Sequence, residues 1–245
     1  MVSPSSRPAL SATASDPLQS PMWAMHRQRL FGDAPLVFDP ALRLNTPELA
    51  ENQHVFPVMV DARGLAGVQR IVIMADLNPI PVAVEFSPGF AAPWLALRIK
   101  LDQRTPVRAA ALTGDGRWHV AGHWIDAAGG GCSAPPVSRA RGDWAENLGK
   151  MRGAAFAGAD GTRLRFAVRH PMDTGLVENI PAYHIETIAI TAPGQEPARL
   201  KVWASVAEDP AFTLILPSGS GAVEVFARDT NGREFTGHVP PPAAP

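Results

Sequence analysis

The sequence predicts an all-β protein made of two β-sandwich domains joined by a connector that contains glycine and proline. Three observations support this fold class. Short runs of branched and aromatic residues recur along most of the chain, separated by Gly, Pro, Asn or Asp. Two of the separating segments are typical of hairpin turns, and a stretch without such runs divides the chain near its middle.

The N-terminal segment precedes the β pattern. Residues 1–20 are rich in Ser, Ala and Pro, and we expect them to be disordered. They contain no apolar stretch of the kind that a signal peptide needs. Patterns typical of structure begin near Trp23. Thr46 followed by Pro47 then predicts a short helix over residues 45–51, because Thr caps helices well and proline suits the first helical position.

The first sandwich is expected over residues 21–132. Its strands are predicted at residues 55–60, 68–75, 82–86, 94–101, 107–113 and 117–125. The segment Gly114-Asp115-Gly116 predicts a tight hairpin, which makes the last two strands antiparallel neighbours. Residues 133–159 are richer in Pro, Gly, Ala and scattered charge. We interpret them as either a linker or a partly ordered crossover.

The second sandwich is expected over residues 160–240. Residues 162–169 alternate strictly, with Leu164, Phe166 and Val168 on one face and arginines on the other, as in a half-buried strand. Further strands are predicted at residues 184–191, 199–206, 212–216, 221–228 and 234–239. Thr230-Asn231-Gly232 is a strong hairpin signal between the last two.

Composition and charge exclude several functions. A net charge of -1 creates no field that would attract nucleic acid, and no stretch approaches the length of a membrane span. A single cysteine rules out an internal disulfide and an all-cysteine metal site. His119 and His123 would lie roughly 13 Å apart on a strand, too far to share a metal. No cofactor motif or catalytic constellation is present, so we expect no cofactor, no metal and no enzyme activity.

Cys132 is the candidate functional residue. It follows Gly129, Gly130 and Gly131, which we interpret as a flexible tether, and prolines follow soon after it. Unpaired cysteines are often small buried hydrophobes, but three glycines offer no side chains to pack. We therefore predict an exposed thiol suited to covalent attachment. A papain-like catalytic cysteine is disfavoured, because a polyglycine tether would not fix a nucleophile beside its base.

Several strings in the two halves resemble known families. In the first half these are Val58-Met59-Val60, Asp76-Leu77-Asn78-Pro79-Ile80-Pro81, Leu97-Arg98-Ile99-Lys100 and Gly130-Gly131-Cys132. They resemble SoxY, the sulfur-carrier subunit of bacterial thiosulfate oxidation. In the second half the strings are Arg169-His170-Pro171-Met172-Asp173-Thr174-Gly175, Asp209-Pro210-Ala211-Phe212 and Asp229-Thr230-Asn231-Gly232. They resemble SoxZ, the partner subunit.

The whole chain looks most like fused SoxYZ-like carriers associated with quinoprotein dehydrogenases. That resemblance implies two immunoglobulin-like sandwiches, a periplasmic location and a cysteine that carries a covalently bound sulfur intermediate between enzymes. It also implies partners among periplasmic redox or hydrolytic enzymes of sulfur oxidation, or a quinoprotein dehydrogenase. The chain departs from SoxY in two respects: Ser133 and Ala134 replace the glycines that follow the cysteine, and more than a hundred residues come after it. Here Cys132 is internal, so its arm is anchored at both ends.

Three classes of function follow. The first is a covalent carrier that presents Cys132 to partner enzymes. The alternative is a non-covalent accessory or binding module for a quinoprotein dehydrogenase, and the third is a structural protein that dimerises through Cys132. In each case the two halves are expected to contact each other, with His170, Pro171 and Met172 as candidates for that contact. An ordinary strand-ending turn is the other interpretation of those three residues.

Overall fold

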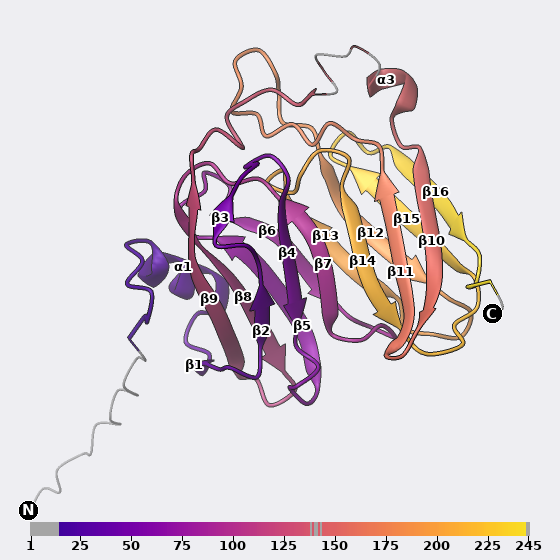
Figure 1. The fold of residues 1–245 in the computed structure, drawn as a ribbon, viewed down its shortest axis with the longest axis horizontal. Coiled ribbons are helices and arrows are strands. Elements are labelled where there is room, and N and C mark those ends of the chain that lie inside the picture. Colours follow the sequence, from indigo (N-terminus) through magenta and orange to yellow (C-terminus); the bar gives the residue numbers. More distant parts are fainter. Residues whose placement is uncertain (1–14, 138, 140–141, 143, 244–245) are drawn as a thin grey trace, which may run out of the picture.

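The computed structural model describes residues 15–137, 139, 142 and 144–243. Two β-sheets pack face to face, and each sheet contains strands from both halves of the chain (Figure 1). The larger sheet has ten strands, in the order β1-β9-β8-β5-β6-β13-β12-β15-β16, with β3 paired to β9. The smaller sheet has six strands, in the order β10-β11-β14-β7-β4-β2. Nearly all pairs are antiparallel, which confirms the predicted immunoglobulin-like β-sandwich class.

The chain passes between the two sheets several times. The first half contains α1 (Trp23–Phe31), β1 (Leu36–Phe38), β2 (Arg43–Asn45), β3 (Leu49–Ala50), β4 (Phe56–Asp61), β5 (Val68–Ala75), β6 (Val82–Ser87), β7 (Trp94–Ile99), β8 (Thr105–Thr113) and β9 (Trp118–Ala127). The second half contains α3 (Trp144–Asn147), β10 (Met151–Gly158), β11 (Gly161–Val168), β12 (Ile185–Thr191), β13 (Ala198–Val202), β14 (Ala211–Leu216), β15 (Val223–Asp229) and β16 (Glu234–Val239).

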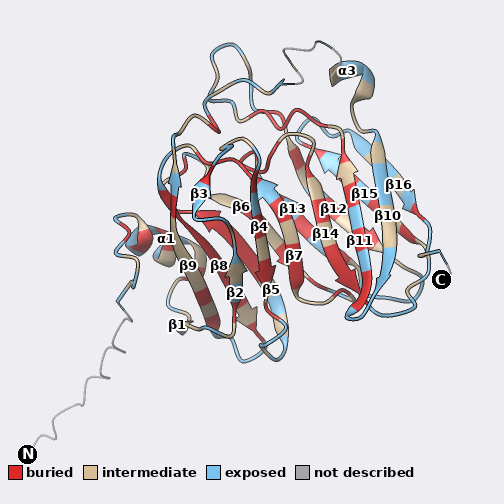
Figure 2. Cartoon of the chain, in the orientation of Figure 1, coloured by how far each residue is buried: buried red, intermediate tan, exposed pale blue. Residues whose placement is uncertain are grey.

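Both sheets are continuous across the two halves. In the large sheet β6 pairs with β13, and Val84 lies opposite Val202. In the small sheet β7 pairs with β14, and Leu95 lies opposite Leu214. Buried residues occur in both sheets from one end of the molecule to the other (Figure 2), and one connected hydrophobic cluster contains residues of both halves. The two sandwiches are therefore joined edge to edge by backbone hydrogen bonds and a shared core.

Most of the predicted strands are confirmed within a few residues. Strand β5 has the predicted bounds, and β11 buries Leu164, Phe166 and Val168 as the alternation predicts. Both predicted hairpins are present, because β8 pairs antiparallel with β9 and β15 pairs antiparallel with β16. These elements have the signals that sequence patterns report best, namely alternation and turn glycines.

The helix predicted over residues 45–51 is wrong. Strand β2 ends at Asn45, and Leu49 and Ala50 form β3, which lies parallel to the end of β9. The amide of Asp126 donates to the Glu48 carbonyl at 3.0 Å. A backbone partner at the edge of β9 therefore outweighs the local preference of Thr46 and Pro47 for a helix start.

The connector predicted over residues 133–159 is also wrong in its last part. Strand β10 occupies residues 151–158 and pairs with β11 along its whole length. Its small residues carry no strand pattern, but they allow a close approach. A Cβ added to Gly153 would lie 2.5 Å from Val239 Cγ2. Residues 151–158 thus belong to the second sandwich.

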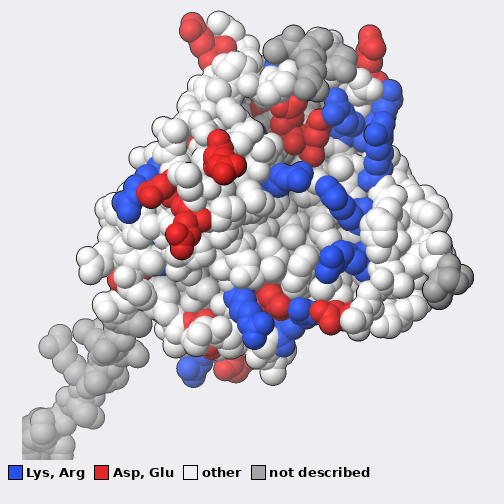
Figure 3. All heavy atoms as spheres, viewed as in Figure 1, with Lys and Arg blue, Asp and Glu red and all other residues white. Residues whose placement is uncertain are grey.

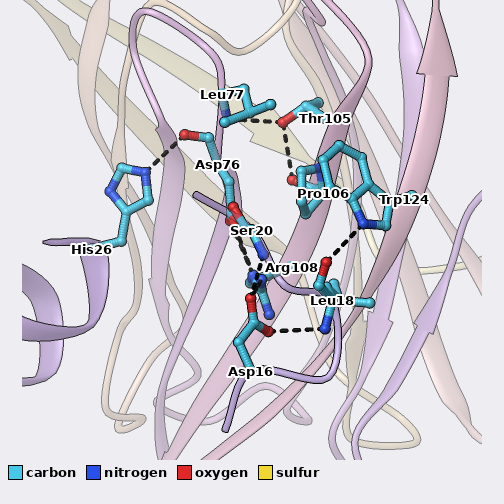
Figure 4. Close-up of polar contacts among 10 residues, drawn as sticks. All are labelled: Asp16, Leu18, Ser20, His26, Asp76, Leu77, Thr105, Pro106, Arg108 and Trp124. Atoms are coloured by element: carbon cyan, nitrogen blue, oxygen red, sulfur yellow. Dashed lines mark hydrogen bonds and ion pairs between the residues drawn. The ribbon is translucent and has the colours of Figure 1, made fainter. Parts of the chain in front are cut away.

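The disorder predicted for residues 1–20 does not extend to residues 15–20, and residues 1–14 lie outside the described part. Arg108 Nη2 donates to Asp16 Oδ2 at 2.8 Å, and Arg108 Nε donates to the buried carboxylate of Asp76 at 2.9 Å (Figure 4). The Trp124 indole donates to the Leu18 carbonyl at 2.9 Å. These contacts fix the segment ahead of α1 against β8 and β9.

Candidate functional site

The segment that carries Cys132 folds back against the end of β7. We call residues 129–133 the cysteine arm. The amides of Gly130 and Gly131 donate to the carbonyls of Asp102 and Leu101 at 3.2 and 3.1 Å. A Cβ on Gly131 would lie 2.4 Å from the Leu101 oxygen and 2.5 Å from the Gln53 oxygen. In this conformation the predicted flexible tether is a docked segment, and its glycines permit close backbone contact.

Cys132 itself is 0% exposed, so the predicted exposure of the thiol is wrong for this conformation. The Asp102 carboxylate fixes the residue from the first half. Its Oδ1 accepts the Cys132 amide at 2.9 Å, the Ser133 amide at 3.1 Å and the Ser133 hydroxyl at 3.0 Å. One carboxylate oxygen therefore holds the tip of the cysteine arm with three donors.

The second half closes over the arm from the other side. The Thr174 hydroxyl donates to the Cys132 carbonyl at 2.7 Å. Two residues earlier, the Met172 carbonyl accepts a hydrogen bond from Lys100 Nζ at 2.5 Å, and the same ammonium donates to the Ala204 carbonyl at 2.9 Å. The cysteine arm thus lies between residues 100–102 of the first half and residues 172–174 of the second.

Burial controls the charge state of the site. It raises the pKa of the Cys132 thiol to about 12, with Lys100 opposing the rise and Asp102 adding to it. Burial also lowers the pKa of Lys100 to about 8, against the opposing effect of Cys132, Asp173 and Glu208. A docked thiol is therefore protonated at neutral pH, and it is a weak nucleophile in that form.

The predicted contact residues His170, Pro171 and Met172 are all buried, and Met172 is the one that bonds Lys100 of the first half. Met172 has a positive φ of 52°, unusual outside glycine. Its amide donates to His170 Nδ1 at 3.1 Å. Burial lowers the pKa of His170 to about 4, despite the nearby Asp229 carboxylate. The imidazole is thus neutral and supports the turn at Met172.

The chain beyond Cys132 is anchored to the second half as well. Arg139 forms a bidentate ion pair with the buried carboxylate of Asp173, and its guanidinium lies 4.4 Å from the ring centre of Trp144. The Val137 amide donates to Glu208 Oε2 at 2.7 Å. Contacts on both sides of Cys132 therefore hold the docked position.

Sequence reasoning missed Lys100, Asp102 and Thr174 as site residues. Lys100 and Asp102 follow strand β7. Lys100 ends the Leu97-Arg98-Ile99-Lys100 string already singled out, whereas nothing in the local pattern distinguishes Asp102. Thr174 had a usable signal, because it lies in the His-Pro-Met string already singled out. The alternation of apolar residues predicts strands, and it does not predict that residue 132 packs against residues 100–102.

The histidines considered as metal ligands have other partners. His119 Nδ1 lies 2.7 Å from Asp39 Oδ2, and His123 Nε2 lies 2.6 Å from the Thr46 hydroxyl. Within the described residues, no group of three His, Cys, Asp or Glu side chains could hold a metal ion. None of the helices in that part of the chain has the length and apolar character of a bilayer span.

Basic side chains gather on the outer face of the small sheet, which faces the viewer in Figure 3. We call this the arginine face, and its exposed members on β7, β10 and β11 are Arg98, Arg152, Arg163 and Arg165. A hollow of about 470 Å³ lies beside Arg98 and Arg165. This face is a surface where an acidic partner could dock.

The fold and the site define the class of protein: a tandem immunoglobulin-like β-sandwich that holds its single cysteine, on a glycine arm, between its two halves. Residues 27–132 match the family model of sulfur oxidation protein SoxY, and residues 151–240 match that of sulphur oxidation protein SoxZ. The chain therefore carries a SoxY-matching domain followed by a SoxZ-matching domain.

Comparison with solved structures finds the sulfur carrier protein SoxY from Chlorobium limicola f thiosulfatophilum, at 22% identity and a TM-score of 0.38, covering 43% of this chain and 96% of that one. A beta-glycosidase from Bacteroides vulgatus matches at 10% identity and a TM-score of 0.26, covering 87% of this chain and 26% of that one. A beta-glucuronidase from Parabacteroides merdae matches at 7% identity and a TM-score of 0.27, covering 81% of this chain and 24% of that one. Scores this low add nothing to the family assignment. A comparison with curated proteins finds no match.

Proposed function

We propose that this protein is a non-enzymatic sulfur carrier of a periplasmic sulfur-oxidation system, with Cys132 as its covalent attachment residue. The observation that supports this best is the position of Cys132. The chain's one cysteine ends the SoxY-matching region and lies on a glycine arm at the junction with the SoxZ-matching region. Hydrogen bonds to Asp102 and Thr174 hold the arm, and a partner could replace them without unfolding either sandwich.

Loading with thiosulfate would form a bond between Sγ and the outer sulfur of thiosulfate. The thiol loses its proton, and two electrons pass to an electron-accepting partner protein. The docked thiol is poorly suited to this step, because burial raises its pKa to about 12. In the proposed cycle a partner draws the cysteine arm out, water restores an ordinary thiol pKa, and loading follows.

Intact-mass measurement tests the proposal. The protein is incubated with thiosulfate and the purified sulfur-oxidation enzymes of its host, and its mass is measured with and without later reduction. We expect a mass increase on Cys132 that a reductant reverses and that Cys132→Ser never shows. If no adduct forms, and Cys132→Ser supports sulfur oxidation in the host as well as the native chain does, the carrier function is excluded.

The second candidate is a non-covalent accessory module for a periplasmic quinoprotein dehydrogenase. The arginine face and its adjoining hollow favour a docking role for this chain. A pull-down separates the two candidates. If Cys132→Ser retains the dehydrogenase as well as the native chain does, and Arg98→Glu with Arg165→Glu loses it, the sandwich surface is the functional part.

A further inference from the structure

Lys100 is a buried cation without a carboxylate partner among the described residues. Its exposed fraction is 5%. Both of its hydrogen bonds go to neutral backbone carbonyls, those of Met172 and Ala204. These bonds orient the ammonium but do not compensate its charge. A charge in the protein interior is costly unless it is paired with a counter-charge, and the carboxylates of Asp173 and Glu208 act on Lys100 electrostatically, without a direct ion pair to it in the described part of the chain.

The neighbouring carboxylates already bind other donors. Asp173 forms a bidentate ion pair with Arg139. Asp102 Oδ1 accepts three donors from Cys132 and Ser133. The sulfur of Cys132 is the group near Lys100 that can still acquire a negative charge. Thr174 holds Cys132 by its carbonyl, two residues beyond the Met172 carbonyl that binds Lys100 Nζ.

The backbone at Met172 supports the same assignment. Its positive φ of 52° is a costly conformation for a side chain with a Cβ. Two contacts maintain it: the Met172 amide donates to His170 Nδ1, and the Ile185 amide contacts the Met172 sulfur at 3.4 Å. The turn directs the Met172 carbonyl at Lys100. Strain of this kind, held by buried neighbours, is typical of a functional site.

We propose that Lys100 is the counter-cation for an anionic sulfur group on Cys132, so that the junction between the two halves binds the charged, loaded form of the cysteine arm. The ligand class is a terminally anionic sulfur adduct, such as a persulfide or an S-thiosulfonate. This inference rests on the proposed carrier function. It assigns Lys100 a role in binding the cargo, and it predicts that loading strengthens docking of the arm.

The test compares an anionic adduct with a smaller, uncharged one, and the same pair in Lys100→Gln controls for the difference in size. Tetrathionate reacts with the Cys132 thiolate to leave an S-thiosulfonate anion on Sγ and release thiosulfate. Methyl methanethiosulfonate leaves an uncharged S-methyl disulfide and releases methanesulfinate. Both reactions are run on the unfolded chain, which is then refolded, and the Tm of each form is measured. No partner enzyme is needed, so failure of this test is distinguishable from failure of the carrier function.

We expect the anionic form of the native chain to melt about 2–4 °C above the neutral form. In Lys100→Gln the order should reverse or the difference vanish, because the anion would then be buried without a counter-charge. Lys201→Gln is the matched control, since Lys201 is exposed on β13, and it should keep the native difference. An equal or lower Tm for the anionic form of the native chain, or an unchanged difference in Lys100→Gln, would overturn the proposal.

A pH series on the native chain keeps the test decisive if Lys100→Gln fails to refold. The difference in Tm should vanish at a pH high enough to deprotonate Lys100, whose pKa burial lowers to about 8 and an adjacent anion would raise again. The other ionisable groups that interact with Lys100 are Asp173, Glu208, His170 and His184. Carboxylates and imidazoles are already deprotonated in that range. A difference that persists at high pH would contradict the proposed role of Lys100.

Discussion

The carboxylate of Asp102 accepts the backbone amide of Cys132 at 2.9 Å, and this contact links the end of β7 to the tip of the cysteine arm. The same oxygen also binds the amide and the hydroxyl of Ser133. Asp102 is thus the main anchor of the arm on the first half, and Thr174 is its counterpart on the second. Accessibility of the thiol should depend on both.

Asp102→Ala should release the cysteine arm. Hydrogen bonds to a charged group contribute about 1.5–3 kcal/mol, so their loss should raise the rate of Cys132 alkylation by about tenfold or more. Mass spectrometry after timed exposure to iodoacetamide measures this rate. Asp126→Ala is the control, because its carboxylate is 66% exposed and pairs with Arg104. Equal labelling rates in Asp102→Ala and the native chain would rule out the anchor.

Thr174→Val should have a smaller effect of the same sign. It removes one neutral donor to the Cys132 carbonyl and keeps the shape of the side chain. A hydrogen bond of this kind contributes about 1 kcal/mol, which corresponds to roughly fivefold faster alkylation. The comparison is Thr187→Val, on the exposed side of β12. If Thr174→Val labels as slowly as Thr187→Val does, the hydroxyl does not hold the arm.

The strands were largely predictable from the sequence, and the joining of the two halves was not. Alternation in β11 and the glycines of the two hairpins are local signals, and local signals specify strands and turns. The pairing of β6 with β13 and of β7 with β14 connects residues more than a hundred positions apart. Strand β10 escaped prediction because its small residues carry no alternation, and β3 because its partner β9 lies far along the chain.

The same limit applies to the site. Composition and the glycine run were sufficient to select Cys132, and the His170-Pro171-Met172 string lies beside it. Exposure was predicted from the absence of side chains in the glycine run. The opposite holds, because a backbone without Cβ atoms can lie flat against Leu101 and Gln53 and bury the next residue. A glycine run can be a flexible tether or a closely packed segment. Which of the two forms depends on the backbone that the run packs against, and the local sequence does not determine that partner.

The thiol should make stability fall at high pH. Burial raises the pKa of Cys132 from 9.0 to about 12, so between these values the folded chain holds a proton that the unfolded chain has lost. The stabilising contribution is full below pH 9.0 and is lost as pH rises toward about 12. Lys100 has the opposite effect on stability. Between about pH 8 and pH 10.5, the unfolded chain binds more protons at this residue than the folded chain, so stability rises with pH.

Comparison with Cys132→Ser separates the two effects. The free energy of unfolding in urea is measured for both proteins across the alkaline range. The native chain should lose stability relative to Cys132→Ser above pH 9.0. The thiolate absorbance of the folded native chain, taken as the difference from Cys132→Ser, should appear well above pH 9.0. A thiolate signal that rises near the ordinary thiol pKa would show that the cysteine is not docked in solution.

Arg108→Met should destabilise the first sandwich strongly. Arg108 is 0% exposed and pairs with the buried Asp76 and with Asp16. Removing one partner of a buried ion pair costs about 3–5 kcal/mol, because the remaining charge has no counter-charge. Urea unfolding measures the loss. Arg117→Met, whose pair with Asp115 is exposed, should change stability by less than about 1 kcal/mol. Similar losses in the two variants would contradict the role of the buried pair.

Gly131→Ala tests whether the glycines serve to allow close backbone contact or to make the arm flexible. The new Cβ would meet the backbone oxygens of Leu101 and Gln53 at 2.4 and 2.5 Å, and neither can move without disturbing the end of β7 or the segment before β4. The arm should therefore undock, and alkylation of Cys132 should accelerate. Gly221→Ala is the matched control, because a Cβ there meets nothing within 4 Å. A flexible tether in solvent tolerates alanine, and a docked arm does not. If Cys132 is alkylated at the same rate in Gly131→Ala as in the native chain, the arm is a flexible tether.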